Sequence, residues 1–337
     1  MGDDELTAWS GRPVLVTGAG GFIGSHLVEQ LVASGARVRA MVRYNGRSDI
    51  GSLVHVPSEV LAEIEVLHSD ITDAWAVRRA ITGVDTVFHL AALIAIPYSY
   101  IAPASYVQTN VVGTLNVLQA VRDLGTRRLV HTSTSETYGT ALYVPIDESH
   151  PLQGQSPYSA SKIGADALAE SYFRSFETPV ATIRPFNTYG PRQSARAVIP
   201  TIATQLIAGR DKIHLGDLRP IRDLTFVDDT VRGFMAVASS DACLGTVTNV
   251  GFGAGVTIGE LAAVLAQVAG RPGVPIIEDA RRFRPVQSEV LQLVADRSKA
   301  LERCGWEPAI SLREGLGRVV DYIRDHLDLY SVGTYST

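Results

Sequence analysis

A glycine-rich turn between an apolar run and a helical pattern is the feature that most limits how this chain can fold. Residues 13–17 have the composition of a buried strand, and residues 23–33 have the spacing of a helix. Between them stand Gly18, Gly21 and Gly24, in the spacing G-x-x-G-x-x-G. Glycine permits a tight turn and lets backbone N–H groups approach a pyrophosphate at the start of a helix. The turn therefore predicts an α/β sheet with a dinucleotide site.

The alternation of strand and helix continues through the first two-thirds of the chain. Further apolar runs read as strands buried on both faces, at 38–42, 64–68, 86–90, 128–133 and 180–184. Helical patterns lie between them, among them those at 106–124 and 158–176. Repeated strand–helix units imply right-handed crossovers and a parallel sheet. We therefore expect a doubly wound, Rossmann-type dinucleotide-binding domain over residues 11–184.

The chain changes character after residue 184, where glycine and proline become frequent and the helical patterns become shorter. Residues 257–260 and 311–314 both have capping-box spacing and are expected to begin helices. Residues 247–250 read as another strand, which we expect to join the first sheet. The sequence thus predicts a smaller C-terminal α/β substrate lobe over 185–330, interleaved with the first domain. A cleft is expected at the carboxyl ends of the strands.

Composition argues against several classes of protein. The formal net charge of −5 over 337 residues gives no electrostatic reason to expect a nucleic-acid partner. The longest strongly apolar stretch, at 90–96, is too short to span a bilayer, and the N-terminus has no apolar signal core. Cys243 and Cys304 are far apart and show no zinc or redox spacing, so no metal site is expected. These features favour a soluble, cytoplasmic protein.

Tyr158 and Lys162 have the spacing Tyr-x-x-x-Lys, which places both side chains on one face of a helix. Ser156 is suited to cap that helix, and Pro157 to begin it. The ammonium of Lys162 is expected to lower the pKa of the Tyr158 phenol. A phenolate can take the proton from a sugar hydroxyl while hydride passes to nicotinamide. Such a pair is common by chance, but it gains weight when it follows a dinucleotide turn.

Thr134 and Glu136 directly follow the strand at 128–133, and strand ends line the expected cleft. The Thr134 hydroxyl can hydrogen-bond the hydroxyl that is oxidised. The Glu136 carboxylate can move a second proton, although a surface glutamate that begins a loop would fit the same position. The Thr-x-Glu spacing, together with the Tyr-x-x-x-Lys pair, favours the catalytic interpretation.

The residues after the second and third strands bear on the choice of cofactor. An NAD enzyme usually has an acidic residue after its second strand, whereas this chain has Arg43. Arg43 can hold a 2′-phosphate, which slightly favours NADP over NAD, or it can be a solvated residue. Asp70 can accept a hydrogen bond from adenine, or it can simply form a turn.

Together these segments resemble the extended short-chain dehydrogenase/reductase family, from about residue 14 to residue 308. The likeness rests on the motifs TGAGGFIG, HLAA, TSTSETYG, YSASK, RPFNTYGPR and RDLTFVDD, at 17–24, 89–92, 132–139, 158–162, 184–192 and 222–229. The triplet Thr134-Ser135-Glu136 is similar to that of nucleotide-sugar 4,6-dehydratases, especially the GDP-mannose type. Residues 91–100 and 143–166 look like dehydratases of legionaminic-type sugar pathways.

The resemblance implies an NADP- or NAD-dependent reaction in three steps. Tyr158 takes the proton of the 4-hydroxyl while carbon 4 gives hydride to the cofactor. Glu136 removes the proton on carbon 5 as the 6-hydroxyl leaves as water, and hydride then returns to carbon 6. In the dTDP-glucose type an aspartate stands where this chain has Ser135, so here Glu136 or a water must handle the leaving group. The product is a nucleotide-linked 4-keto-6-deoxyhexose.

The resemblance also implies which residues bind the cofactor and the substrate. Besides the three glycines, Arg43, Asp70, Tyr158 and Lys162, the cofactor site includes Phe22, Ile23, Ile71, Leu90, Ala91 and Ala92. The nucleotide-diphosphate sugar is assigned to Ser135, Asn187, Arg192, Arg222, Arg284 and Glu289. Arginine forks suit phosphate oxygens. The family further suggests a homodimer through 106–124 and 158–176, or a homotetramer.

Three other functions remain open at the level of sequence. UDP-glucuronate decarboxylases also carry Thr-Ser-Glu, and they need a basic contact for the sugar carboxylate. A sugar 4-epimerase has no need of a base at Glu136. A catalytically silent dinucleotide-binding regulator would share the fold, but it would not need Thr134, Glu136, Tyr158 and Lys162 together.

Overall fold

The computed structural model describes residues 9–282 and 289–330. A central sheet of seven parallel strands has the order β10-β6-β5-β4-β1-β2-β3. Its strands are β1 (Pro13–Thr17), β2 (Arg37–Arg43), β3 (Glu65–Ser69), β4 (Thr86–His89), β5 (Arg128–Thr132), β6 (Val180–Pro185) and β10 (Val247–Val250). All seven predicted strands are present, with ends that differ by at most one residue, and β10 joins the sheet beside β6 as expected.

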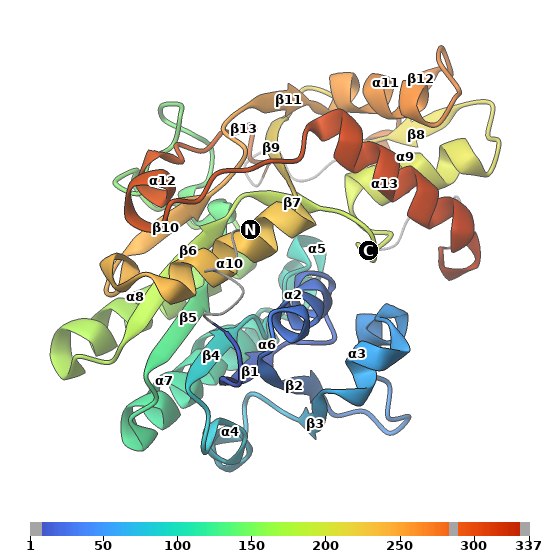
Figure 1. Ribbon diagram of the computed structural model, residues 1–337. Coiled ribbons are helices and arrows are strands. Elements are labelled where there is room, and N and C mark those ends of the chain that lie inside the picture. The colour runs from blue at the N-terminus through green and yellow to red at the C-terminus, as the bar shows by residue number, and fades with distance from the viewer. Residues whose placement is uncertain (1–8, 283–288, 331–337) are drawn as a thin grey trace.

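Helices cover both faces of this sheet (Figure 1). One face packs against α2 (Phe22–Ala33) and α10 (Val227–Ser239), and the other against α4 (Ala74–Ile81), α7 (Gly113–Leu124) and α8 (Pro157–Phe176). The alternation of side chains along a strand produces the two cores, since Val14 and Val16 enter the first and Leu15 the second. The fold is therefore the predicted doubly wound, Rossmann-type arrangement.

The helix predicted at 106–124 differs from a regular α-helix. It consists of α6 (Pro103–Tyr106), a π-helical segment (Val107–Val112) and α7. Inside the π-helical segment, Asn110 accepts a hydrogen bond from the backbone N–H of Leu93 at 2.8 Å and donates to Ser161 Oγ at 2.9 Å. A π-helical turn widens the helix and is frequent near functional sites. Through these two hydrogen bonds, the π-helical segment connects the loop after β4 to helix α8.

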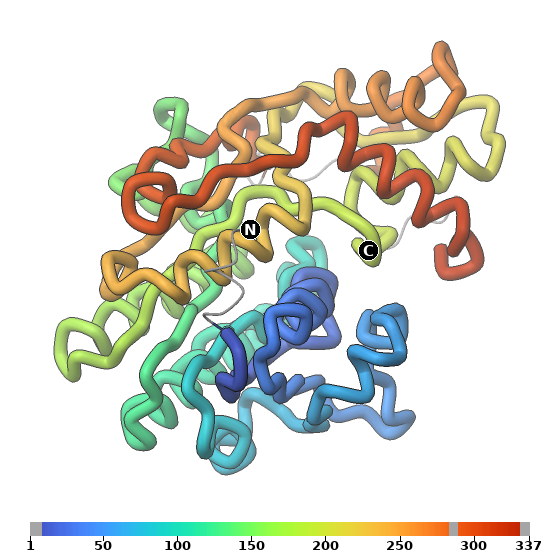
Figure 2. Tube along the Cα trace, viewed as in Figure 1, coloured from blue at the N-terminus to red at the C-terminus, as the bar shows by residue number. Residues whose placement is uncertain are grey.

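The second half of the chain builds a smaller lobe, yellow to red in Figures 1 and 2. Its strands are β7 (Asn187–Tyr189), β9 (Ile221–Phe226), β11 (Gly255–Thr257) and β13 (Gln292–Leu293) in one small sheet, with β8 (Ile213–Leu215) and β12 (Ile276–Glu278) paired separately. Its helices are α9 (Val198–Ile207), α11 (Ile258–Val268) and α13 (Leu312–Asp325), whereas α12 (Ser298–Cys304) packs against β10 and α10 of the central-sheet domain. Thr257 and Glu260 form the predicted capping box, and Ser311 caps α13.

The remaining short helices lie in loops near the sheet, namely α3 (Ser58–Ala62) and α5 (Ile96–Ile101). Across the described part of the chain, every helix is too short or too polar to cross a bilayer.

The glycine turn after β1 is as tight as the sequence predicts. Gly18 has a φ of +71°, and a Cβ there would lie 2.7 Å from the backbone nitrogen of Ala91. A Cβ on Gly24 would overlap the carbonyl oxygen of Gly18 and lie 3.0 Å from Cα of Ala19. Both obstacles are backbone atoms, which cannot rotate away. The close packing of α2 on the sheet therefore requires glycine at both positions.

Replacement of Gly24 by alanine should lower the free energy of unfolding by about 1–3 kcal/mol, because the backbone of the turn must shift. Gly317 provides a matched control, since it lies inside α13 and a methyl group added there would meet no atom within 4 Å. Gly317→Ala should raise the free energy of unfolding by about 0.5–1 kcal/mol. Urea unfolding followed by circular dichroism measures both changes. Equal effects of the two substitutions would contradict this account of the turn.

Candidate active site

A cavity of about 1200 Å³ runs from the glycine turn across the strand ends to the smaller lobe. The predicted cofactor residues all line it: Gly18, Gly21, Phe22, Ile23, Gly24, Arg43, Asp70, Ile71, Leu90, Ala91, Ala92, Tyr158 and Lys162. It is also lined by the predicted reacting and substrate residues Thr134, Ser135, Glu136, Asn187, Arg222 and Glu289. The fold thus brings residues from distant parts of the sequence to one surface at the carboxyl ends of the strands.

Arg192 is the exception among the predicted residues that the structure describes, because it does not line the cavity. Its φ of +67° turns the side chain toward α2, where its Nη2 lies 2.8 Å from Oε2 of Glu29. The expected contact of Arg192 with a phosphate therefore finds no support in the geometry. Arg284, which was also expected near the substrate, lies outside the described residues.

The glycine end of the cavity has the features that a dinucleotide needs. Helix α2 begins there after Gly21, which provides no side-chain cap for the first N–H groups. Such N–H groups suit a pyrophosphate. Arg43, the last residue of β2, and Asp70, which follows β3, line the same end. Hydrogen bonds from Thr72 hold the pKa of Asp70 below its ordinary value, and the charge of Arg43 acts in the same direction. Asp70 thus forms a turn and also faces the cavity.

Helix α8 presents Tyr158 and Lys162 to the centre of the cavity. Ser156 and Ser159 form a capping box at its start, and Pro157 occupies its first turn, as the sequence predicts. Tyr158 and Lys162 are both buried, and Nζ of Lys162 donates to the backbone oxygen of Thr132 at 2.6 Å. This bond holds the ammonium at the end of β5, one helical turn from the phenol.

The pKa values of this pair show how strongly burial acts on the site. Loss of hydration raises the pKa of Tyr158 above its ordinary value, while a hydrogen bond with Thr134 lowers it and the charge of Glu136 raises it. Burial also lowers the pKa of Lys162 to about 8, against an opposing effect of Asp166. The expected lowering of the Tyr158 pKa is therefore wrong for the chain by itself, because dehydration and the charges of Glu136 and Asp166 together outweigh the hydrogen bond with Thr134.

Thr134, Ser135 and Glu136 stand at the end of β5, opposite this pair. A short 3-10 helix (Ser135–Tyr138) begins there, and Oγ1 of Thr134 accepts the N–H of Glu136 at 3.3 Å. Ser135 is buried, whereas Glu136 is half-buried. Within the described residues, no hydrogen bond engages the Glu136 carboxylate. Its oxygens are thus available to the cavity, close enough to Tyr158 to influence the phenol.

A buried polar network behind the cavity fixes these elements relative to one another. The carboxylate of Asp166, on α8, accepts from Ser133 Oγ at 2.5 Å and from Nη2 of Arg184 at 2.7 Å, and it lies 3.0 Å from Nε2 of His131. Burial opposes ionisation, but the His131 hydrogen bond and the Arg184 charge hold the pKa of Asp166 well below its ordinary value. Helix α8 is thereby joined to strands β5 and β6.

His89 and His131, near the ends of β4 and β5, make buried hydrogen bonds. His89 lies 2.8 Å from Oγ1 of Thr17 and 3.0 Å from Oγ1 of Thr114, and His131 belongs to the Asp166 network. Among the described residues, no group of three or more His, Cys, Asp or Glu side chains could hold a metal ion. Tyr138 is also buried, and its hydroxyl donates to Asn249 at 2.8 Å, so its role is packing.

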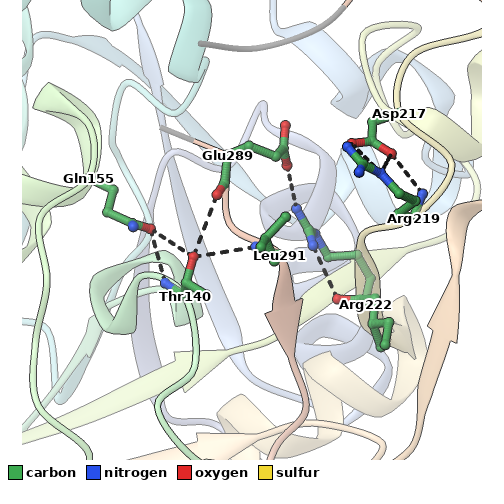
Figure 3. Close-up of polar contacts among 8 residues, drawn as sticks. Thr140, Gln155, Asp217, Arg219, Arg222, Glu289 and Leu291 are labelled. Atoms are coloured by element: carbon green, nitrogen blue, oxygen red, sulfur yellow. Dashed lines mark hydrogen bonds and ion pairs between the residues drawn. The ribbon is translucent and has the colours of Figure 1, made fainter. Parts of the chain in front are cut away.

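The far end of the cavity, in the smaller lobe, has a paired arginine (Figure 3). Nη2 of Arg222 donates to Oε1 of Glu289 at 3.0 Å, and both side chains are mostly buried. The backbone oxygen of Glu289 accepts a long bond of 3.5 Å from Thr140, and Asp217 is held by Arg219 nearby. Arg222 and Glu289, predicted separately as substrate ligands, thus form one ordered unit.

Sequence reasoning missed a further group of cavity residues, which lie mainly in loops. They include residues 93–98 after β4, Arg196 before α9, residues 215–217 at the end of β8, and Arg282. Residues 93–98 lie within a segment that resembles known dehydratases, but no role followed from the resemblance. Loop residues have no periodicity that reveals which side they face, so only the fold could place them.

Replacement of Asp166 by asparagine should lower the free energy of unfolding at neutral pH by about 3–5 kcal/mol, because the buried charge of Arg184 loses its partner. The pKa of Asp166 is depressed in the folded state, so its contribution is present near pH 7 and is lost as the pH falls through that low value. Denaturant unfolding at several pH values should show a smaller loss for the variant on acidification.

Glu170→Gln is the matched control for this prediction. Glu170 lies one turn further along α8 and pairs with Arg174 on the surface. An exposed pair of this kind contributes less than about 1 kcal/mol. An equal loss of stability in both variants would contradict the assignment of the Asp166 network as the anchor of α8.

The comparisons with known proteins agree with this geometry. The family model described as GDP-mannose 4,6 dehydratase matches residues 15–319. A dTDP-glucose 4,6-dehydratase of Streptomyces griseus is 34% identical over 321 residues, covering 93% of this chain and 94% of the relative. UDP-glucuronic acid decarboxylase 1 of Arabidopsis thaliana is 35% identical over 324 residues, covering 93% of this chain and 70% of the relative. A UDP-glucose 4-epimerase matches at similar identity.

The likeness extends to solved structures. A dTDP-glucose 4,6-dehydratase from Streptomyces venezuelae, solved with NAD bound, has a TM-score of 0.83 and 31% identity to this chain, covering 95% of this chain and 99% of its own. Three different reactions thus occur among relatives of similar identity. The sequence match, the sheet order and the cavity together show that this chain belongs to the GDP-mannose 4,6-dehydratase family of nucleotide-sugar enzymes, within the extended short-chain dehydrogenases/reductases.

Proposed function

We propose that the protein is a nucleotide-sugar 4,6-dehydratase, which converts a nucleotide-linked hexose to its 4-keto-6-deoxy form. The observation that carries this proposal is the convergence of Tyr158, Thr134 and Glu136 on one wall of the cavity. A hydroxyl oxidation needs the phenol alone, whereas an elimination needs a second group that moves a proton. The unengaged carboxylate of Glu136 is that second group.

We propose NADP or NAD as the cofactor, with NADP slightly favoured. The glycine turn has no room for side chains, and the start of α2 suits a pyrophosphate, so the residues present fit a dinucleotide. When bound, the nicotinamide would accept hydride from carbon 4 of the sugar and return it to carbon 6. Arg43 faces the cavity at the end of β2 and would contact a 2′-phosphate. A related dehydratase was solved with NAD bound, so the affinities of this chain for NADP and for NAD should both be measured.

The side chains of this chain would divide the proton transfers between them. Tyr158 would take the proton of the 4-hydroxyl, with the Thr134 hydroxyl hydrogen-bonded beside it. Glu136 would remove the proton on carbon 5, which a neighbouring ketone acidifies. Ser135, which has no ionisable group, would leave Glu136 or a water to protonate the departing 6-hydroxyl. The ammonium of Lys162, anchored on Thr132, would favour the phenolate once charge develops.

The diphosphate of the substrate would lie toward the smaller lobe. Arg222 is held by Glu289 and is therefore ordered for contact with phosphate oxygens. Asn187 lines the same cavity, and its buried Oδ1 has no hydrogen-bond partner among the described residues. A buried acceptor without a partner is costly, so a donor on the substrate would satisfy it.

UDP-glucuronate decarboxylation is the second candidate, because an arginine that faces the cavity, Arg196, could meet a sugar carboxylate. A 4-epimerase or a silent binding protein would leave Glu136 without a role. We further propose a homodimer through the helical segments 106–124 and 158–176, or a homotetramer, since Val107, Leu115 and Phe176 remain exposed on these segments.

Incubation of the purified protein and cofactor with UDP-, GDP- and dTDP-linked hexoses, hexosamines and UDP-glucuronate should give a product that has lost one water, as seen by mass spectrometry. In D₂O the product should carry deuterium on carbon 5, because the proton removed there is replaced from solvent. Loss of carbon dioxide from UDP-glucuronate would instead identify a decarboxylase. An isomer of unchanged mass would identify an epimerase.

Tyr158→Phe should lower kcat about 10²–10⁴-fold, because general base catalysis is lost, while cofactor binding, measured by fluorescence, persists. Glu136→Gln should also abolish water loss but permit oxidation at carbon 4, which would be seen as a sustained rise in reduced cofactor absorbance, because hydride can return to carbon 6 only after water has left. Tyr143→Phe is the control, since the Tyr143 hydroxyl contacts Asp147 and does not line the cavity. Full dehydration by the Glu136 variant would contradict the proposed base.

Arg43→Ala should weaken NADP binding about tenfold or more and change NAD binding little, because only NADP carries the 2′-phosphate that the guanidinium would hold. Arg47→Ala is the control, since Arg47 lies four residues further along the loop and does not line the cavity. Calorimetric titration of both cofactors checks this prediction. An equal effect of Arg43→Ala on both cofactors would remove the case for NADP.

A further inference from the structure

Residues 190–193 form a β-turn between β7 and α9, and Arg192 occupies its third position. The N–H of Gln193 donates to the backbone oxygen of Gly190 at 3.4 Å, and Pro191 stands at the second position. A third turn residue with positive φ is usually glycine, yet Arg192 has a φ of +67°. This conformation costs an L-residue free energy. The contacts of the arginine side chain must therefore offset that cost.

The side chain of Arg192 lies on helix α2, which begins at the dinucleotide end of the cavity. Nη2 of Arg192 lies 2.8 Å from Oε2 of Glu29, and Nη1 lies 3.5 Å from Oγ of Ser25. On the same helix, Nε2 of His26 donates to the backbone oxygen of Pro191 at 3.0 Å. Burial lowers the pKa of His26 to about 4, and the charge of Arg192 acts in the same direction, so this histidine is neutral near pH 7. The turn is thus attached to α2 by neighbouring side chains.

The segment that follows the turn forms part of the wall of the main cavity. The cavity is lined there by Gln193, Ser194, Arg196 and Ala197. We call residues 193–197 the wall segment. None of its residues belongs to a helix or strand. Its position therefore depends on the elements at its two ends, which are the turn held by α2 and helix α9.

A second contact joins the dinucleotide end of the cavity to the smaller lobe beside this turn. The 3-10 helix Gly51–His55 follows β2, and its first residue lines the cavity. The ring of His55 meets those of Tyr322 and His326 at the end of α13, with 6.4 Å and 5.9 Å between ring centroids. Burial, His326 and Arg192 lower the pKa of His55, so the guanidinium acts on this contact as well. Arg192 is thus close to elements of both lobes that border the dinucleotide site.

We propose that Arg192 is a positioning residue, which couples occupation of the dinucleotide site to the order of the wall segment. A pyrophosphate bound by the first N–H groups of α2 would restrain that helix. The contacts of Glu29 and His26 would pass this restraint to the turn and to residues 193–197. A sugar donor would then meet an ordered wall, and its binding would carry a smaller entropic cost. This inference rests on the proposed cofactor, and it holds whichever of the family's reactions the protein catalyses.

Direct contact of Arg192 with a substrate phosphate explains these observations less well. The Arg192 side chain is 9% exposed and does not line the cavity. To reach a phosphate, its guanidinium would have to leave the carboxylate of Glu29. Arg222, in contrast, already lines the cavity and is ordered for that role. The geometry therefore favours a role for Arg192 behind the cavity wall.

Hydrogen–deuterium exchange of the whole protein, with and without NADP or NAD, tests this coupling. In the unchanged chain, saturating cofactor should slow amide exchange in the wall segment about threefold or more, because the segment becomes ordered. Arg192→Asn removes the ion pair, while asparagine accepts a positive φ. We expect this variant to bind the cofactor, as measured by fluorescence, and to keep the slowing at the start of α2. The slowing in the wall segment should be lost.

Four further variants separate the coupling from general effects on stability. Glu29→Gln should lose the slowing as Arg192→Asn does, and the double variant should lose no more than either single one, because both remove the same ion pair. Arg192→Lys should keep part of the slowing, since lysine retains the charge. Arg39→Gln is the matched control and should keep all of it, because Arg39 pairs with Glu65 at 2.8 Å and lines neither the main cavity nor the small hollow beside it.

Steady-state kinetics give a second readout, with the donor that the panel of nucleotide sugars identifies. In Arg192→Asn and Glu29→Gln, KM for that donor should rise about tenfold, because the donor itself must order the wall segment. The value of kcat should change less than about threefold, since the reacting groups keep their positions on β5 and α8. A purely structural role would lower kcat and cofactor affinity together.

The possible failures can be told apart. Unchanged exchange in the wall segment when the cofactor binds the unchanged chain, or slowing that persists in Arg192→Asn, would overturn the coupling. A joint loss of cofactor binding and kcat in Glu29→Gln would also overturn it, since Arg192 would then be merely structural. Absence of turnover with every donor, together with the expected exchange results, would overturn the proposed function and support the coupling. Absence of cofactor binding would overturn both.

Discussion

The buried carboxylate of Asp166 joins helix α8 to strands β5 and β6, and the arrangement of the reacting side chains depends on this junction. It takes hydrogen bonds from Ser133 and Arg184 and lies against His131. A buried charge is stable only with such partners. Because Tyr158 and Lys162 stand two turns and one turn before Asp166 on the same helix, the network that satisfies this charge also sets the position of the phenol and the ammonium over the strand ends.

The burial of Tyr158 and Lys162 also makes the pKa values of both groups sensitive to nearby charges. Tyr158 and Lys162 have lost most of their hydration, which raises the pKa of the phenol and lowers that of the amine to about 8. Electrostatic interactions are stronger in a dehydrated site than in water. A ligand that brings charge near this pair will therefore act strongly on both groups. Glu136, which also acts on the Tyr158 phenol, is less buried than this pair.

The regular parts of this fold could be predicted from sequence, because local patterns determine them. The apolar runs indicated the strands, the glycines indicated the turn, and the spacing of Tyr158 and Lys162 indicated their common face. Three features depend on distant contacts and were missed or misjudged. The π-helical segment forms around the bonds of Asn110 to Leu93 and Ser161, Arg192 turns back to Glu29, and the pKa of Tyr158 follows from burial, which spacing does not reveal.

Relatives with three different reactions match this chain at similar identity, so overall likeness cannot separate those reactions. The reason is that different parts of the fold line different parts of the cavity. Thr134, Glu136, Tyr158 and Lys162, which we propose to act on the sugar, stand at a strand end and on α8, whereas loops line much of the rest of the cavity. These loops include the one after β4 and the segment with Arg196 before α9. The choice of substrate should therefore follow these loops, and changes there should alter specificity without disturbing the reacting groups.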